Sequence, residues 1–263
     1  MQAIGIFDSG IGGLTVFAAI RRALPDESLI YLGDTARVPY GTKSAETVIK
    51  YSVQCAQFLA HRGLKALVVA CNTSSAYSLP FLSKEVGVPV IGVIEPGAKA
   101  AIEASRSQHI GVIGTPATVN SNAYARLIKE HSPSARVVSK ACPLFVPLVE
   151  EGWLSNEVTK LTAHIYLDSF KKEKIDSLIL GCTHYPLLKP VIQEVVGDSV
   201  RLIDSAEATA SELKKMLGES GLLADKGDKA FHQIYVTDVP GRFETIVAGF
   251  LGKDMPDVKR VEL

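Results

Sequence analysis

The stretch SLILGCTHYP, from Ser177 to Pro186, decides the fold that we expect for this chain. Its apolar run indicates a buried strand, which stops at a glycine and is followed directly by Cys182 and by polar side chains. The stretch ALVVACNTS, from Ala66 to Ser74, has the same pattern around Cys71. Each half of the chain therefore places one cysteine at the carboxyl end of a predicted strand.

A second pair of similar stretches indicates an internal duplication. The stretch HIGVIGTP, from His109 to Pro116, echoes AIGIFDSG, from Ala3 to Gly10, as a strand, a polar turn and the start of a helix. The matching Ile4 and Ile110 lie 106 residues apart, and the two cysteines lie 111 residues apart. Two echoes at nearly the same offset favour duplication over coincidence.

Strands alternate with helices along the sequence. Predicted strands cover 3–7, 29–32, 66–70, 90–93, 109–113, 135–139, 176–180, 201–203, 232–236 and 258–261. Predicted helices cover 14–23, 44–62, 75–86, 96–104, 116–131, 144–151, 156–171, 205–217 and 241–251. This alternation predicts an α/β fold of two similar parallel-sheet domains related by pseudo-symmetry, with the active site in the cleft between them. We expect residues 1–96 plus 205–263 to form the first domain and residues 97–204 the second.

The composition is that of an ordinary globular protein and excludes several classes. The 263 residues carry 28 basic and 28 acidic side chains, so no excess of positive charge points to nucleic acid or to an anionic membrane. No apolar run approaches the roughly 18 residues that a membrane span requires. The amino terminus enters a predicted strand without a basic or hydrophobic leader, so we expect a cytoplasmic protein. The four cysteines form no CxxC pair, so we expect neither a disulfide framework nor a metal cluster.

Cys71 and Cys182 are the candidate catalytic residues. A free cysteine is usually a small buried side chain, and Cys55 and Cys142 fit that description. Cys71 and Cys182 instead follow strands, where the active sites of open α/β folds lie. Two thiols that face one cleft could form a redox pair, ligate a metal or exchange protons. A redox pair usually has close sequence spacing, and a metal site made of both cysteines and His184 lacks an evident fourth ligand.

Proton exchange from opposite faces has a specific use. Inverting a stereocentre requires removal of a proton on one side and delivery of a proton on the other. An unperturbed thiol has a pKa of about 8.5, close enough to neutrality to serve as acid or base. His184 could stabilise the thiolate of Cys182 or relay a proton, and Asp8 is its counterpart on the side of Cys71. The loop from Ser9 to Gly13 opens a predicted helix, so its amides could hold a carboxylate or a phosphate.

Five stretches of the chain carry a family resemblance. They are Gly5–Leu14, Val38–Gly41, Ala70–Thr73, Cys142–Gly152 and Leu180–Pro186. Together they resemble the cofactor-independent aspartate/glutamate racemases. The resemblance implies interconversion of L- and D-glutamate for peptidoglycan synthesis, without pyridoxal phosphate or a metal ion. Homodimers are common in this family, so a homodimer with a small-molecule substrate is one expectation.

The resemblance also implies roles for individual residues. Cys71 and Cys182 would act on opposite faces of the α-carbon, Cys71 on D-glutamate and Cys182 on L-glutamate. Asp8, His184 and one glutamate of the Glu150–Glu151 pair, with Glu150 as the candidate, would assist proton transfer. The residues that would bind the substrate are Asp8, Ser9, Pro39, Tyr40, Gly41, Asn72, Thr73, Thr115, Thr118, Thr183 and His184.

Three alternative functions stay open at this point. An aspartate racemase has a similar fold and paired cysteines, although the combination of Asp8-Ser9-Gly10 with Cys182–Pro186 favours glutamate. A protein that binds an acidic ligand without chemistry would need no second thiol. A thiol hydrolase with Cys182 as nucleophile and His184 as base leaves Cys71 unexplained.

Overall fold

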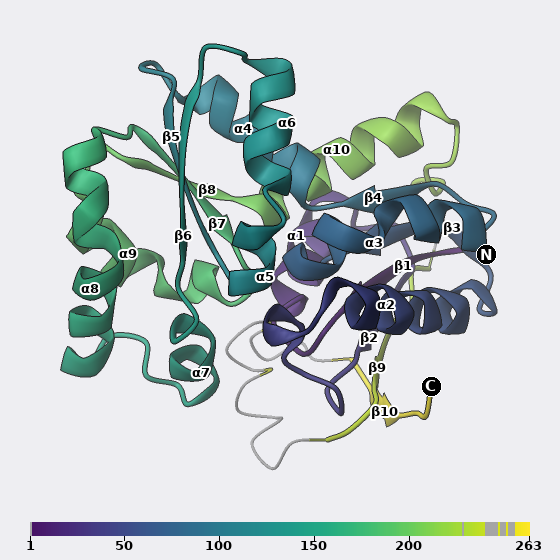
Figure 1. Ribbon diagram of the computed structural model, residues 1–263. Coiled ribbons are helices and arrows are strands. Elements are labelled where there is room, and N and C mark those ends of the chain that lie inside the picture. The colour runs from purple at the N-terminus through teal and green to yellow at the C-terminus, as the bar shows by residue number, and fades with distance from the viewer. Residues whose placement is uncertain (1, 228, 240–246, 248–250, 252–255) are drawn as a thin grey trace.

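The computed structural model describes residues 2–227, 229–239, 247, 251 and 256–263, and within them the strands form two parallel sheets (Figure 1). The strand order of the first sheet is β10 (Val258–Arg260), β9 (His232–Val236), β2 (Leu29–Gly33), β1 (Ala3–Asp8), β3 (Leu64–Val69) and β4 (Val90–Gly92). The strand order of the second sheet is β6 (Arg136–Ala141), β5 (His109–Gly114), β7 (Ser177–Gly181) and β8 (Arg201–Asp204). The predicted α/β fold class is confirmed.

Four strands of the first sheet have the same order as the four strands of the second sheet. β2, β1, β3 and β4 lie side by side in the first sheet, and β6, β5, β7 and β8 take the same places in the second. Cys71 follows shortly after β3 and Cys182 directly after β7, so the two cysteines follow equivalent strands. All six residues of β3 and all five of β7 are buried, as expected for parallel strands with helices on both faces.

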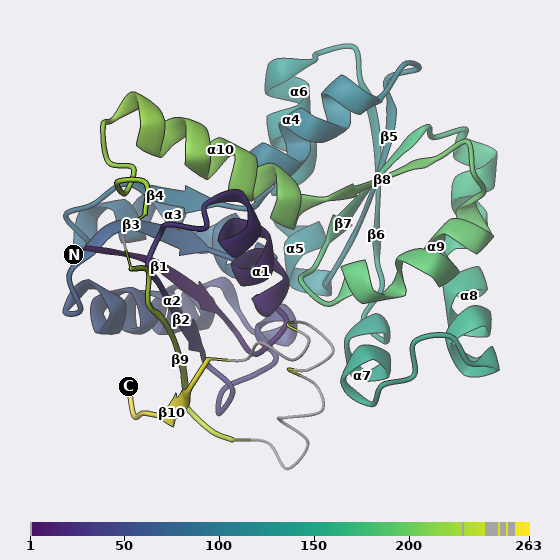
Figure 2. The ribbon, with the colours of Figure 1, turned by 180° about the vertical axis from the view of Figure 1, so that it is seen from behind.

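Helices cover both faces of each sheet (Figure 2). On the first sheet, one face carries α1 (Leu14–Ala23) and α10 (Ser205–Glu219), and the other carries α2 (Ala45–Ala60) and α3 (Asn72–Glu85). On the second sheet, one face carries α7 (Phe145–Glu150), α8 (Glu157–Glu173) and α9 (Lys189–Val196), and the other carries α4 (Ile94–Ala104) and α6 (Ala123–His131). The short helices are α5 (Pro116–Asn120) and the 3-10 turns η1 (Tyr40–Thr42) and η2 (Tyr185–Leu188).

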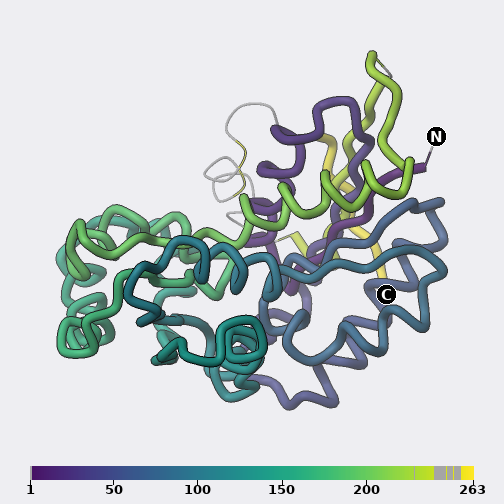
Figure 3. The backbone as a smooth tube through the Cα atoms, turned by 90° about the horizontal axis from the view of Figure 1, so that it is seen from above, coloured from purple at the N-terminus to yellow at the C-terminus, as the bar shows by residue number. Residues whose placement is uncertain are grey.

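The two halves lie beside each other, as the view from above shows (Figure 3). β8 leads directly into α10, which returns from the second sheet to pack against α1. β9 and β10 then add to the first sheet beyond β2. In the described part of the chain, no helix is long and apolar enough to cross a membrane.

Three details differ from the sequence-based expectations, and a fourth expectation falls outside the described residues. α3 begins at Asn72, so Cys71 stands directly before the first turn of a helix. The single helix expected at 116–131 is two helices, because Asn122 adopts a left-handed conformation with φ of 53°. α9 was not among the predicted helices, because its Pro190 resembles a helix breaker but sits in the first turn, where proline is tolerated. The helix expected at 241–251 falls, apart from residues 247 and 251, outside the described residues.

Candidate active site

A cavity lies beyond the carboxyl ends of the central strands and is lined by both halves of the chain. It encloses about 350 Å³ of space, part of which is open to solvent. Both candidate cysteines line it, and their exposed fractions are only 5% for Cys71 and 7% for Cys182. The lining residues are Ser9, Val38, Pro39, Tyr40, Gly41, Cys71, Asn72, Thr73, Thr115, Val146, Cys182, Thr183 and His184.

Cys71 lies in an environment that favours the neutral thiol. Its Sγ donates a hydrogen bond to Ser9 Oγ over 3.6 Å. Burial, followed by the nearby charge of Asp8, raises the pKa of the Cys71 thiol to about 11. Since both causes penalise the thiolate, ionisation of Cys71 depends on a change in its surroundings.

Asp8 is fully buried behind Cys71, at the end of β1. Its Oδ2 accepts hydrogen bonds from the amides of Gly10 and Gly13, each over 3.1 Å. Burial raises the pKa of Asp8, although His184 and these amides act in the opposite direction. A Cβ on Gly13 would lie 2.4 Å from Asp8 Cβ, so this close approach requires glycine. Asp8 Oδ1 has no hydrogen-bond partner among the described residues.

Cys182 lies beside an imidazole that is itself paired with a carboxylate. Cys182 Sγ lies 3.8 Å from His184 Nδ1, and His184 Nε2 lies 3.1 Å from Glu150 Oε1. Burial alone would lower the pKa of His184, but its hydrogen bonds with Cys182 and Glu150 outweigh burial and raise the pKa to about 10. At neutral pH the imidazole is therefore protonated, which places a positive charge next to Cys182.

The glycine loop of the first half contacts the histidine loop of the second half. A Cβ on Gly12 would lie 2.5 Å from Thr183 Oγ1 and 2.6 Å from His184 Nδ1. Thr15 Oγ1 also lies within 3.3 Å of the carbonyl oxygen of Thr183. The main chain at Gly12 thus sets the position of His184 relative to Asp8.

Three threonine hydroxyls join the two halves at the cavity. Thr73 Oγ1, from α3, lies 3.0 Å from Thr115 Oγ1 and 3.2 Å from Thr118 Oγ1. Nearby, the hydroxyl of Tyr124 donates to Asn72 Oδ1 over 2.7 Å. This bond orients the amide of Asn72, whose buried Nδ2 has no partner among the described residues and is available to a ligand.

The Val38–Gly41 segment forms another wall of the cavity. A Cβ on Gly41 would lie 2.6 Å from Thr115 Cβ, so the main chain of this wall packs directly against the second half. The ring of Tyr40 is buried, and its hydroxyl donates to Asp34 Oδ2, away from the lining residues. The phenol therefore anchors the wall.

The structure brings most of the sequence-predicted site residues to one place. Asp8, Thr118 and Glu150 are the predicted residues that do not line the cavity, and each contacts the site through another group: Gly13, Thr73 and His184. Val38 and Val146 line the cavity but were not predicted to be site residues. Both belong to stretches that carry the family resemblance, yet an apolar side chain gives no chemical signal by itself.

The chemistry of the site is that of thiols, hydroxyls and amides. None of the residues that line the cavity is Lys or Arg, so an anionic ligand would depend on neutral donors and on His184. The first amides of α3, at Asn72 and Thr73, are such donors, because the first turn of a helix leaves them without helical partners. In the described part of the chain, no group of three or more His, Cys, Asp or Glu side chains could hold a metal ion.

Comparison with known proteins gives consistent matches over the chain. The sequence model of the Asp/Glu/Hydantoin racemase family matches residues 4–213. A glutamate racemase of Geobacter metallireducens is 54% identical over 262 residues, which cover 100% of this chain and 97% of the relative. The solved glutamate racemase isoform RacE1 of Bacillus anthracis superposes with a TM-score of 0.96 at 43% identity, over 100% of this chain and 98% of its own. The glutamate racemase of Francisella tularensis, solved in complex with D-glutamate, superposes with a TM-score of 0.93 at 41% identity, over 99% and 97% of the two chains. The chain belongs to the Asp/Glu/Hydantoin racemase family.

Proposed function

We propose that the protein interconverts L- and D-glutamate by a two-base mechanism in which Cys71 and Cys182 exchange protons with the α-carbon. One observation carries the proposal: the two thiols follow equivalent strands of two similar halves and line the same cavity. Glutamate is the substrate because the relatives that match over the full length are glutamate racemases. The two thiols supply both proton transfers, so the proposed reaction requires no cofactor.

The proposed reaction moves one proton off the substrate and one proton onto it. The thiolate of one cysteine removes the α-proton, and the electron pair of the C–H bond is delocalised into the adjacent carboxylate. The thiol of the other cysteine then donates its proton to the opposite face of the same carbon. The second cysteine ends as a thiolate, so the pair is ready for the reverse direction. We expect Cys182 to act on L-glutamate and Cys71 on D-glutamate.

Each cysteine has a neighbour that can support its change of charge. Because ionised Asp8 raises the pKa of Cys71, protonation of Asp8 would ease ionisation of Cys71, so one proton can be shared between them. On the other side, protonated His184 can form a charge-assisted hydrogen bond with the thiolate of Cys182. Glu150 in turn supports the charge of His184.

The substrate would be held mainly by neutral donors. The buried amide of Asn72, the first amides of α3 and the hydroxyls of Thr73, Thr115 and Thr183 suit the two carboxylates. Asp8 does not line the cavity, so its carboxylate would act on the ammonium group through its charge. We further propose that the D-glutamate serves peptidoglycan synthesis and that the protein is cytoplasmic. A homodimer stays a prediction.

Deuterium incorporation tests the reaction. In deuterated water, without added cofactor, the purified protein should convert either glutamate enantiomer into the other, with deuterium at the α-carbon of the product. Mass spectrometry measures the deuterium content of the product, and chiral chromatography measures the conversion between enantiomers. Exchange with aspartate in place of glutamate would establish the alternative racemase. Exchange with neither would rule out a racemase and leave the binding protein and the thiol hydrolase.

Variants of the cysteines test the two-base scheme. Cys71→Ser and Cys182→Ser should each reduce kcat by a factor of about 10³ or more, and the double variant should lose no more than either, since the pair acts as a unit. Cys142→Ser is the matched control, because Cys142 is buried but does not line the cavity. Near-normal racemisation by either single variant would rule out the scheme.

A further inference from the structure

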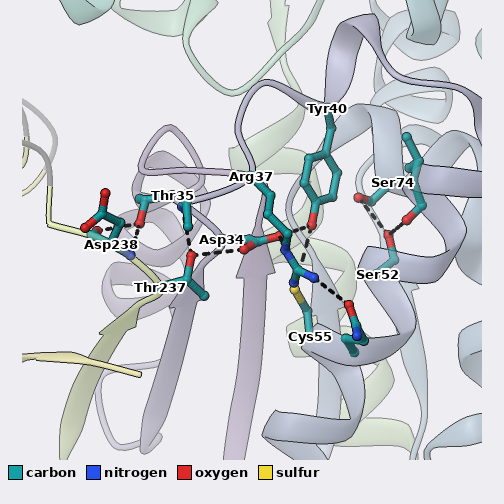
Figure 4. Close-up of polar contacts among 12 residues, drawn as sticks. Asp34, Thr35, Arg37, Tyr40, Ser52, Cys55, Ser74, Thr237 and Asp238 are labelled. Carbon is teal, nitrogen blue, oxygen red and sulfur yellow. Dashed lines mark hydrogen bonds and ion pairs between the residues drawn. The ribbon is translucent and has the colours of Figure 1, made fainter. Parts of the chain in front are cut away.

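A chain of buried hydrogen bonds runs from the end of β9 to the wall of the cavity (Figure 4). Thr237, directly after β9, donates from Oγ1 to Asp34 Oδ1 over 3.0 Å. The other oxygen of this carboxylate, Oδ2, accepts from the hydroxyl of Tyr40 and, over 2.6 Å, from Nε of Arg37. Thr237 lies beyond residues 4–213, the part of the chain that the family model matches.

The direction of these hydrogen bonds is fixed by the groups involved. The amide of Ala36 donates to Thr237 Oγ1 over 2.9 Å, so the single hydroxyl proton of Thr237 is given to Asp34. Burial, followed by the charges of Cys55 and Asp34, raises the pKa of Tyr40 far above its ordinary value, so its phenol also donates. Asp34 is fully buried and accepts from both sides.

Tyr40 connects the carboxylate of Asp34 to the wall of the cavity. Its ring is 1% exposed and is held between Asp34 and Tyr51, with a centroid distance of 5.7 Å between the two tyrosine rings. The adjoining Pro39 and Gly41 line the cavity, and Gly41 packs against Thr115 of the second half. A shift of the phenol would therefore move the cavity wall.

We propose that Thr237 is a positioning residue of the active site: through Asp34 and Tyr40 it holds the Val38–Gly41 wall in the place that binds substrate. The expected effect on substrate binding rests on the proposed racemase function. The expected effect on the order of the Val38–Gly41 wall does not depend on that function.

A second contact between the same two segments offers a matched control. Thr35 Oγ1 donates to the carbonyl oxygen of Asp238 over 2.5 Å and accepts from the amide of Asp238 over 2.8 Å. This pair also ties the end of β9 to the loop after β2, but it does not reach the carboxylate of Asp34. Both Thr35→Val and Thr237→Val therefore weaken the contact between the end of β9 and the loop after β2. Only Thr237→Val also removes a hydrogen bond to Asp34, the residue that holds the hydroxyl of Tyr40.

Steady-state kinetics with both glutamate enantiomers give the first test. Thr237→Val removes the hydrogen bonds with Asp34 and with the amide of Ala36, and loss of the bond to Asp34 should raise KM about fivefold. The value of kcat should change less than about twofold, because the wall binds ground state and transition state alike. Thr237→Ser should restore KM, and Thr35→Val should leave it unchanged. Tyr40→Phe should raise KM as well, and adding Thr237→Val to it should have little further effect, since both act along one path.

Hydrogen–deuterium exchange gives a test that needs no activity. In the full-length protein, amides of a peptide spanning residues 38–43 should exchange about fivefold faster or more in Thr237→Val, and at the wild-type rate in Thr35→Val and Thr237→Ser. Equal effects of Thr237→Val and Thr35→Val, or an unchanged peptide in Thr237→Val, would overturn the inference. If the wild-type protein fails to racemise glutamate, the proposed function fails, and this measurement still decides the role of Thr237.

Discussion

At the scale of single residues, the two thiols have unequal surroundings. Burial and the charge of Asp8 raise the pKa of Cys71 to about 11, whereas Cys182 faces a histidine whose pKa is about 10. At neutral pH a neutral thiol therefore stands on one side of the cavity and an imidazolium on the other. A site built from similar halves is thus electrostatically asymmetric, and its two directions of reaction need not have the same pH dependence.

The contact between Glu150 and His184 gives a prediction about pH. Glu150→Gln removes a partner that raises the pKa of His184, so the alkaline limb of kcat/KM for L-glutamate should move to lower pH by about one unit. Because the pKa in the folded protein lies above the ordinary 6.5, the stabilisation from this pairing is complete below pH 6.5 and lost as the pH rises through about 10. Rate profiles between pH 6 and 10.5 measure the shift.

The control for this experiment is Glu157→Gln, which removes the same charge from the exposed first turn of α8. Its pH profile should match that of the wild type. An unchanged alkaline limb in Glu150→Gln would show that Glu150 does not support the charge of His184.

Residues with distinctive chemistry could be predicted from the sequence, and residues without it could not. Cys71, Cys182 and His184 stand at strand ends, where a reactive side chain is conspicuous, and the structure brings all three to the cavity. Val38 and Val146 line the cavity with apolar side chains, which no chemical pattern in the sequence marks. Thr237 contacts Asp34 across 203 positions of sequence, and only the pairing of β2 with β9 brings them together.

At the scale of secondary-structure elements, the break between α5 and α6 is held by specific hydrogen bonds and positions a residue at the cavity. Asn122 adopts φ of 53°, and its carbonyl oxygen still accepts from the amide of Arg126 at the start of the next helix. The change of direction lets Tyr124 reach Asn72 at the cavity. A single straight helix, as the sequence pattern predicts, would leave that amide without its partner.

This break gives a prediction about stability. Asn122→Val should lower the free energy of unfolding by about 1–2 kcal/mol, because a β-branched residue is strained in a left-handed conformation. Asn122→Gly should stay within about 0.5 kcal/mol of the wild type. Asn120→Val makes the same chemical change at the end of α5, where φ is not left-handed, and serves as the control. Urea titration measures all three; equal losses for both valine variants would contradict the explanation.

The elements themselves could largely be predicted, because most strands are short apolar runs closed by polar turns. The errors arose where two signals compete. Pro190 conceals the start of α9 because proline both begins and breaks helices. Asn122 lies within an apparently continuous helical pattern, and its left-handed conformation depends on packing that the pattern does not contain.

At the scale of the whole molecule, the cavity and a buried ion pair lie at opposite ends of the first sheet. The cavity lies beyond the carboxyl ends of the strands. Near their amino ends, Lys65 Nζ lies 2.5 Å from Glu27 Oε2 and donates to the carbonyl oxygen of Leu222 over 2.7 Å. The amide of Ala224 donates to Glu27 Oε1 over 2.8 Å. This buried pair ties the segment after α10 to the base of the sheet.

Removal of one partner of this pair should destabilise the fold without changing the chemistry. Lys65→Met leaves the buried charge of Glu27 without a counter-charge, so the free energy of unfolding should fall by about 3 kcal/mol, with kcat of the folded protein unchanged. Adding Glu27→Gln should recover part of the loss. Lys99→Met, which breaks the exposed pair with Glu95, should cost less than about 1 kcal/mol. Thermal unfolding and racemisation below the transition measure the two properties separately; a fall in kcat would contradict the separation.

The near-complete enclosure of Cys71 and Cys182 has a consequence for the chemical durability of the protein. Peroxides and alkylating agents attack the thiolate of an accessible cysteine, and both of these sulfurs are shielded by walls drawn from the two halves. Reagents that reach them must therefore enter the same cavity that a ligand would occupy. A saturating ligand should accordingly act as an antioxidant for the two sulfurs.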